Sequence, residues 1–182
     1  PYYRQGLEAR LAVLGSFHRD VAVSYGKLGR CAYLKKHFKE AEKYLNKAMK
    51  IFARLYAEAS SDEERREARY YSGDTIVELE RLWMEQGNYE KALKYCQESY
   101  DIFYSRNRCE IANSAYSLVD MGICCSALGR YEDAEAYLNR ALELNLSLNG
   151  KTSVQTVRTR TAIADNAARQ HDRERAEQLY LE

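Results

Sequence analysis

Proline and glycine are scarce in this sequence, which has one proline and nine glycines among 182 residues. So few helix-breaking residues exclude a collagen-like rod and a proline-rich linker, and they are not typical of a loop-rich β-sandwich. The chain also lacks the run of about 18–20 uncharged apolar residues that spans a membrane, and its first residues do not form a signal peptide. We therefore expect a mostly helical, soluble and cytoplasmic protein without a membrane partner.

An excess of charge of one sign is also missing. The 28 basic and 27 acidic residues leave a net charge of +1, while 46% of the residues are hydrophobic. Such a balance creates no overall field that would attract a polyanion. The sequence can thus bury a core, and nucleic acid is not the expected partner.

Residues that carry out chemistry are few and dispersed. The five cysteines are an odd number without a CxxC pair, and the three histidines are far apart and form no HExxH motif. This pattern predicts reduced, buried thiols in a reducing compartment. We predict a non-enzymatic protein with no catalytic residue, cofactor or metal site.

A repeated block is the main feature that is present. Related segments begin at Lys36, Gln86, Leu128 and Gln170, and each contains one alanine in the same register. The spacings between these alanines are 51, 42 and 42 residues, from the positions of Ala41, Ala92, Ala134 and Ala176. A period of this size predicts stacked supersecondary units.

A second helix precedes each block. Apolar and small residues recur there at i, i+3, i+4 and i+7, as in Tyr25, Leu28, Gly29 and Ala32, and again in Leu118, Met121, Gly122 and Cys125. This spacing places each set on one helical face. The glycines predict that two helices of a hairpin approach closely at those points.

Taken together, these positions resemble the tetratricopeptide repeat, and the 42-residue spacing is similar to its kinesin-light-chain-like subtype. The resemblance implies an all-α fold, an α-solenoid of stacked antiparallel helix pairs in a right-handed superhelix. It also implies a scaffold that binds proteins or peptides. Because the kinesin-light-chain-like subtype often has a histidine in the turn between repeats, the resemblance further implies a structural role for His18.

The register predicts the organisation of the chain. We expect a single array with a half-repeat at 1–14, helix pairs at about 20–57, 62–106 and 109–148, and a truncated pair at 153–182, as a fragment of a longer chain. The nine extra residues of the first spacing fall between Ser60 and Tyr71 and should lengthen the following helix. The truncated edge at Gln178–Glu182 is a predicted contact with absent chain or with a second copy.

Turn and cap residues agree with this register. Gly87 and Gly129 should end helices in a left-handed conformation, and Asn88 should cap the next helix. Capping boxes are expected at three further helix starts, formed by Ser61 with Glu64, Asn107 with Glu110, and Thr152 with Gln155.

The first helices of the pairs should line a concave groove, with residues next to the packing positions pointing into it. The predicted groove residues are Val23, Gly26, Arg30, Tyr33, Asp74, Val77, Arg81, Met84, Tyr116, Val119, Ile123, Ser126, Arg158, Thr161, Asp165 and Arg169. This mixture of apolar, aromatic and arginine side chains suits a peptide with apolar anchors and some acidic residues.

Two functions follow from these predictions. The favoured one is a protein-binding scaffold, as the sensor or assembly part of a larger regulatory protein, with Arg30, Arg81 and Tyr116 as leading contacts. The alternative is a helical-repeat RNA-binding module. It would need a continuous basic inner face, which Asp74 and Asp165 interrupt.

Overall fold

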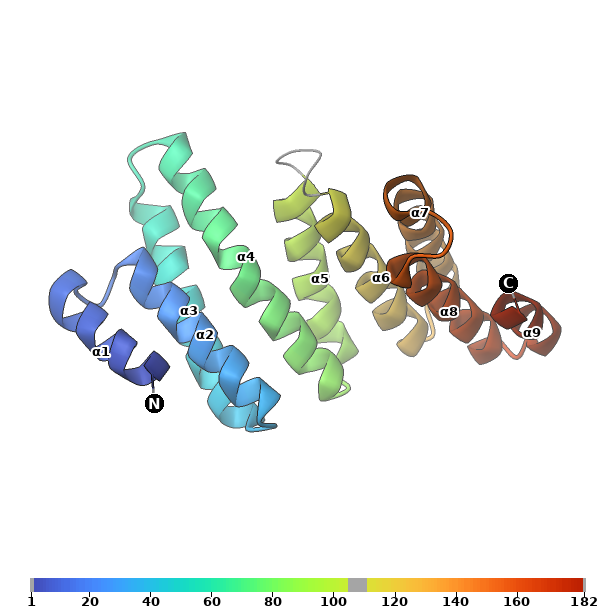
Figure 1. Cartoon of the computed structure of the whole chain (residues 1–182), viewed down its shortest axis with the longest axis horizontal. Coiled ribbons are helices and arrows are strands. Elements are labelled where there is room, and N and C mark those ends of the chain that lie inside the picture. The colour runs from blue at the N-terminus through green and yellow to red at the C-terminus, as the bar shows by residue number, and fades with distance from the viewer. Residues whose placement is uncertain (1, 105–110, 182) are drawn as a thin grey trace. The chain divides into compact units, whose positions relative to one another are not determined.

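The computed structural model describes residues 2–104 and 111–181, and over these residues the chain is helical without any strand (Figure 1). This confirms the all-α prediction. The helices are α1 (Tyr2–Leu14), α2 (Arg19–Leu34), α3 (Phe38–Glu58), α4 (Asp62–Glu85), α5 (Tyr89–Tyr104), α6 (Ile111–Ala127), α7 (Tyr131–Asn149), α8 (Val154–Arg169) and α9 (Arg173–Leu181).

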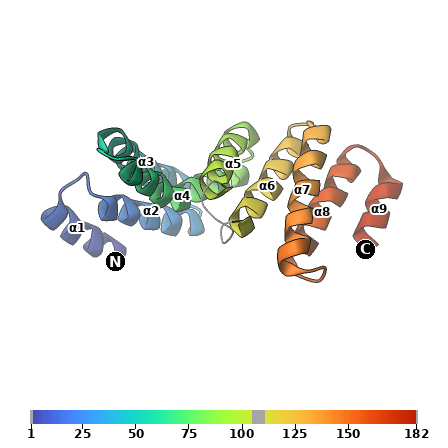
Figure 2. The same cartoon turned by 90° about the horizontal axis from the view of Figure 1, so that it is seen from above.

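The chain forms two compact units, unit 1 at 1–86 and unit 2 at 87–182, and each is described by itself. In unit 1, α1 packs on α2, and α2 and α3 form an antiparallel hairpin against which α4 packs. There α2 and α4 lie in one layer and α3 lies in the other (Figure 2). In unit 2, α5 packs on α6, the α6–α7 hairpin packs on α8, and α8 packs on α9. A single array over 1–182 stays a prediction.

The long α4 confirms the predicted effect of the insertion. This helix has 24 residues, whereas α2 and α8 have 16 each. Its first residue, Asp62, lies within the inserted segment, which contains no proline and no glycine before Gly73. The extra residues therefore extend the helix at its N-terminal end.

The two predicted close approaches are present. A Cβ atom added to Gly29 would lie 2.6 Å from Cγ of Leu45, and one added to Gly122 would lie 2.5 Å from Cγ of Leu138. Both leucines are 0% exposed. Each hairpin is therefore packed so tightly that a leucine from its second helix fills the space where a side chain on the first helix would stand.

Four turns share one backbone conformation. The residue five places before each repeat alanine has a positive φ: 59° at Lys36, 70° at Gly87, 76° at Gly129 and 64° at His171. The predicted left-handed turns at Gly87 and Gly129 are confirmed. Lys36 and His171 adopt the same conformation although a Cβ atom makes it unfavourable.

We expect His171→Gly to raise the free energy of unfolding by about 1 kcal/mol, because glycine adopts a positive φ without a steric penalty. Urea denaturation followed by circular dichroism measures the change. The matched control is Gly129→Ala in the same unit, which should lower stability. An unchanged or lower stability of His171→Gly would contradict the prediction.

The structure confirms the Asn88 cap, whose Oδ1 accepts from the Lys91 N–H at 3.2 Å. The box at Ser61 is formed in part: Ser61 Oγ accepts from the Glu64 N–H at 3.2 Å, while the Glu64 carboxylate accepts from the Ser60 N–H at 2.7 Å. The box at Thr152 and Gln155 is wrong by one residue, because Ser153 Oγ accepts from the Thr156 N–H at 3.1 Å. The third box, at Asn107 and Glu110, lies outside the described residues.

Three of the predicted buried thiols are confirmed. Cys96, Cys124 and Cys125 are buried, and Cys31 is half-buried. Burial raises the pKa of the Cys125 thiol to about 11, so this sulfur stays protonated near neutral pH. Cys109 lies outside the described residues.

Among the described helices, none combines the length and the low charge needed to cross a bilayer.

The C-terminal edge of unit 2 leaves apolar side chains uncovered. Tyr180 is 53% exposed and Leu181 is 83% exposed at the end of α9. Self-association through this edge stays a prediction.

Candidate functional site

The predicted groove residues divide between two surfaces, one in each unit. We call the surface of α2 and α4 in unit 1 the first face, and the surface of α6 and α8 in unit 2 the second face. The first face carries Arg30, Tyr33, Asp74, Val77, Arg81 and Met84, and the second carries Tyr116, Val119, Ile123, Arg158, Asp165 and Arg169. Each face is built from two helices that contact each other directly.

A buried carboxylate stands at the centre of the first face. Glu78 of α4 is 8% exposed at its side chain, and its Oε1 lies 3.5 Å from Arg30 Nε and 3.3 Å from Arg81 Nη1. The two arginine side chains are 53% and 51% exposed. Glu78 thus pairs with one guanidinium from each helix, and about half of each arginine side chain stays exposed.

Burial dominates the electrostatics of Glu78. Desolvation raises the pKa of its carboxyl, and the opposing attraction of Arg81 and then Arg30 does not cancel the effect. Its Oε2 is buried and accepts no hydrogen bond among the described residues. The groove residues predicted from the sequence do not include Glu78. The Glu78–Arg81 spacing of i,i+3 indicates only half of this cluster.

We expect Glu78→Gln to make the protein more stable at neutral pH. Because the pKa of Glu78 is raised in the folded state, the folded protein binds this proton more tightly than the unfolded chain does. The contribution of Glu78 to stability is therefore present below its unfolded pKa and is lost as the pH rises through its folded pKa.

Thermal unfolding of the parent and of Glu78→Gln between about pH 4 and pH 8 tests this sign. The two curves should converge in acid and separate as the carboxyl ionises, with the variant higher. A variant that is less stable at neutral pH would show that the ion pairs outweigh desolvation.

Apolar, aromatic and acidic side chains also belong to the first face, besides Arg30 and Arg81. Val77 and Met84 of α4, four residues before and three residues after Arg81, are half-buried. The ring of Tyr33 lies 6.3 Å from that of Phe38, measured between centroids. Asp74 is 89% exposed at its side chain, with Lys27 Nζ 4.0 Å away. The first face therefore combines partly covered apolar side chains with exposed charge.

The second face is held together by its own polar contacts. Arg158 of α8 donates to Asp120 of α6, whose side chain is 13% exposed. The guanidinium lies 6.0 Å from the centroid of the Tyr116 ring, and the Tyr116 hydroxyl accepts from Gln155 Nε2 at 2.9 Å. Asp165 accepts from the Tyr180 hydroxyl.

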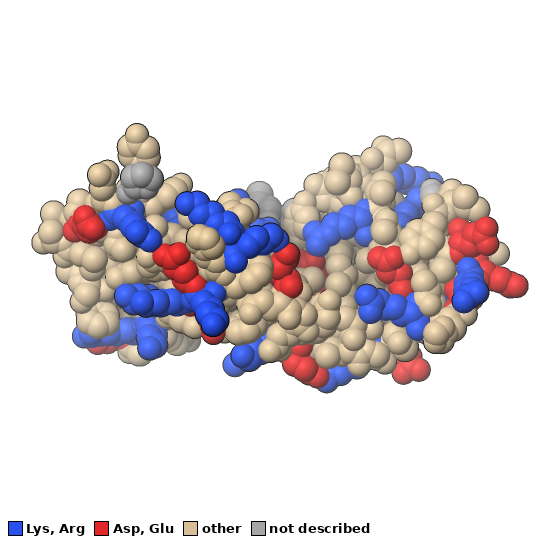
Figure 3. All heavy atoms as spheres, turned by 90° about the horizontal axis from the view of Figure 1, so that it is seen from below, with Lys and Arg blue, Asp and Glu red and all other residues tan. Residues whose placement is uncertain are grey.

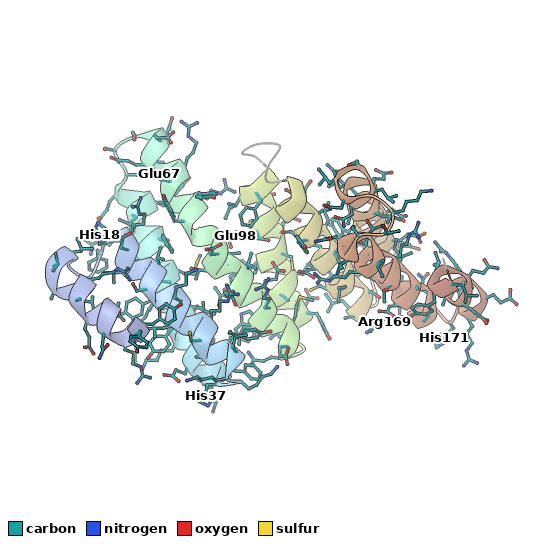
Figure 4. All side chains as sticks on the ribbon, viewed as in Figure 1. His18, His37, Glu67, Glu98, Arg169 and His171 are labelled. Carbon is teal, nitrogen blue, oxygen red and sulfur yellow. The ribbon has the colours of Figure 1, made fainter. Side chains whose placement is uncertain are left out.

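Two residues expected on the second face are buried instead. Val119 is 2% exposed and Ser126 is 6% exposed. The helix that carries them, α6, packs against α5, α7 and α8 together, so a wider part of its circumference is covered than the sequence pattern indicated. Ile123 is half-buried and Thr161 is exposed, while Arg169 is exposed at the end of α8, beside the turn that holds His171 (Figure 4).

The histidines lie in three different turns (Figure 4). His18 is the N-cap of α2, where its Nδ1 accepts from the Asp20 N–H at 3.1 Å. This confirms the predicted structural role of His18. His37 precedes α3, and its side chain makes no capping hydrogen bond.

Basic and acidic side chains are interspersed over each unit on the side shown in Figure 3. This matches the near-neutral composition. Where a ligand binds, selectivity must then come from local groups such as Glu78 and its arginines rather than from a field of one sign.

Comparisons with known proteins agree with the fold. The family model of the tetratricopeptide repeat matches residues 1–54, 82–145 and 110–182. No curated protein sequence matches the chain.

Three solved structures illustrate the likeness. The first contains the nearly identical TPR-like repeats of a kinesin light chain from Podosopora anserina; it shares 16% identity, with a TM-score of 0.72 and coverage of 97% of this chain and 80% of the other. The apo form of RapI shares 22% identity, with a TM-score of 0.77 and coverage of 97% and 58%. BtubC (BKLC) from P. vanneervenii shares 17% identity, with a TM-score of 0.70 and coverage of 98% and 68%.

Identities this low show the fold alone, and this chain spans 58% of the length of RapI. The family model covers well over half of the chain, and the helical hairpins with their glycine and alanine contacts are those that the repeat pattern predicted. The chain therefore belongs to the tetratricopeptide repeat family, and its structural relatives include kinesin-light-chain-like repeats.

Proposed function

We propose that this protein is a non-enzymatic scaffold that binds a peptide or protein segment on its first and second faces, as the sensor or assembly part of a larger regulatory protein. Tetratricopeptide repeats are in general protein–protein interaction modules.

The observation that carries the proposal is the pair of half-exposed arginines held by buried Glu78. Arginine is enriched at binding hot spots, and a guanidinium that is already oriented loses less conformational freedom when it binds. Val77 and Met84 add apolar surface beside it. The first face thus offers both parts of an interface, an apolar centre and a polar rim.

Local charge favours a ligand with some acidic residues. The cluster around Glu78 on the first face contains three cations, Lys27, Arg30 and Arg81, and two anions, Asp74 and Glu78. On the second face, the predicted groove residues Arg158 and Arg169 are matched by the carboxylates of Asp120 and Asp165. We therefore expect a ligand of the first face to carry acidic residues.

RNA binding is the weaker candidate. Asp74 is almost fully exposed, and Asp165 is exposed on the second face. Carboxylates in these places would repel a phosphate backbone. Salt-dependent retention of RNA on a filter, lost when Arg30 and Arg81 are replaced, would restore this candidate.

Alanine substitutions test the proposal. Peptides selected from a displayed random library on the parent protein should bind the Arg30→Ala, Arg81→Ala double variant at least about tenfold more weakly, as expected for hot-spot truncation. Tyr116→Ala should weaken ligands of the second face. The measurement is fluorescence anisotropy with purified protein.

The matched control removes two exposed basic side chains of unit 1 away from the first face, with Lys43→Ala and Lys50→Ala on α3. This variant should bind as the parent does. Selected peptides that bind the parent, the double variant and the control equally would refute the assignment of the first face.

A further inference from the structure

Five basic residues form a single row along α3. Successive members are four, four, three and four residues apart, so at about 100° per residue they fall within an arc of about 80°. All five are exposed, whereas the opposite side of α3 is buried in unit 1. We call this row of Lys39, Lys43, Lys47, Lys50 and Arg54 the basic stripe; at 1.5 Å per residue it is about 22 Å long.

Most of the basic stripe has no internal partner. Among the described residues, only Arg54 makes an ion pair, with Glu58 at 2.7 Å, and Lys47 Nζ lies 5.2 Å from the centroid of the Tyr25 ring. No carboxylate of these residues lies within 4.0 Å of Lys39, Lys43 or Lys50. Like charges at i,i+4 destabilise a helix slightly, so the stripe does not serve the stability of α3.

The repeat itself does not require the stripe. In the same register, α5 has Glu90, Lys94, Glu98 and Asp101, and α7 has Glu132, Ala136, Arg140 and Glu143. These helices contain the same buried repeat alanine as α3, but they carry acidic or mixed residues at the positions that correspond to the basic stripe. The run of one sign is therefore a property of α3 and not of the packing that all repeats share.

The stripe is narrow because carboxylates border it. Glu40 and Glu58 lie on one side of the row and Glu42 on the other, by their positions on the helix. A nucleic acid duplex or an anionic membrane is wider than one row of side chains and would bring its charge onto these carboxylates. The apolar side of α3 is buried, so α3 cannot insert into a bilayer.

A single acidic helix fits these limits. Glutamates spaced by three and four residues on such a helix form one row with the same repeat as the lysines of α3. We propose that the basic stripe of α3 binds an acidic helical segment of a partner protein. The stripe lies in the layer opposite α2 and α4, so this contact is separate from peptide binding on the first face (Figure 2).

A designed peptide tests the proposal. The probe is a fluorescein-labelled alanine-based helix of about 20 residues with one row of glutamates spaced by three and four; its control has the same composition with the glutamates spread around the helix. At low ionic strength the row peptide should bind more tightly. The Lys39→Gln, Lys43→Gln, Lys50→Gln triple variant should lose about tenfold in affinity, since exposed ion pairs contribute modestly each.

A matched triple variant, Lys35→Gln, Arg66→Gln, Arg69→Gln, removes the same charge from unit 1 outside the stripe and should bind the row peptide nearly as the parent does. Circular dichroism checks that both variants are folded. Equal losses in the two variants, or equal binding of the row and spread peptides, would overturn the proposal.

Charge reversal and other polyanions complete the test. The Lys39→Glu, Lys43→Glu, Lys50→Glu variant should no longer bind the row peptide. It should instead bind a peptide in which lysines replace the row of glutamates. Duplex RNA and phosphatidylserine vesicles should bind the parent more weakly than the row peptide. Tighter binding of either, lost in the triple glutamine variant, would overturn the proposal in favour of that polyanion.

Discussion

Replacing Leu138 with alanine should lower the free energy of unfolding by about 2–5 kcal/mol, and adding Gly122→Ala should recover part of this loss. Leu138 is 0% exposed and fills the space above Gly122, where a Cβ would lie 2.5 Å from Leu138 Cγ and 3.3 Å from the Ala134 carbonyl oxygen. The single substitution leaves a cavity beside Gly122, and the methyl group of an alanine there would occupy some of it.

The sign of the effect of Gly122→Ala should depend on its neighbour. With Leu138 present, the new methyl group overlaps a buried side chain, and the cost of about 1–3 kcal/mol exceeds the gain of about 1 kcal/mol in helix propensity. With alanine at 138, both the propensity and the filled space favour the substitution. Urea denaturation of the four proteins measures this coupling, which should be at least about 0.5 kcal/mol.

The same four-protein comparison, a double-mutant cycle, can be made independently in unit 1. Gly29 and Leu45 have the same geometry in the α2–α3 hairpin, with 2.6 Å between the built Cβ and Leu45 Cγ. The coupling free energy between the glycine and leucine substitutions should have the same sign in both hairpins. Additive effects at both sites would show that the close approach of the hairpin helices does not depend on these glycines.

These glycine contacts were predictable because they depend on a local pattern that recurs. Gly29 and Gly122 occupy the same register relative to Ala41 and Ala134, and a glycine on the apolar face of a helix indicates that a second helix approaches closely there. The long α4 was predictable for a similar reason, since its extra residues contain nothing that ends a helix.

The departures from prediction arise where non-local contacts or several competing residues decide. Lys36 and His171 adopt a positive φ because the hairpin geometry imposes it, whatever side chain is present. The cap moved from Thr152 to Ser153 because adjacent hydroxyl residues compete for one helix start. The helix pattern alone could not show that Glu78 joins Arg30 of another helix, since that contact depends on how α2 and α4 pack.

Phe52→Ala should destabilise unit 1 by about 3–5 kcal/mol, the range for a large aromatic side chain removed from a core. Phe52 of α3 is 2% exposed and lies in a cluster with Leu7 of α1 and with Val21, Ala22 and Leu28 of α2. This cluster therefore joins three helices. Urea denaturation should show the loss, and hydrogen exchange should show lower protection in α1, α2 and α3 together.

Leu7→Ala is the matched control, because it removes apolar volume from the same cluster at its edge. Leu7 is the one buried residue of α1, so its truncation should release this helix while α2 and α3 remain protected. Hydrogen exchange then separates the two effects: the amides of α1 lose protection in both variants, and those of α2 and α3 only in Phe52→Ala. The same exchange pattern in both variants would mean that α1 and the α2–α3 hairpin unfold as one cooperative element, and that the cluster around Phe52 has no weaker edge.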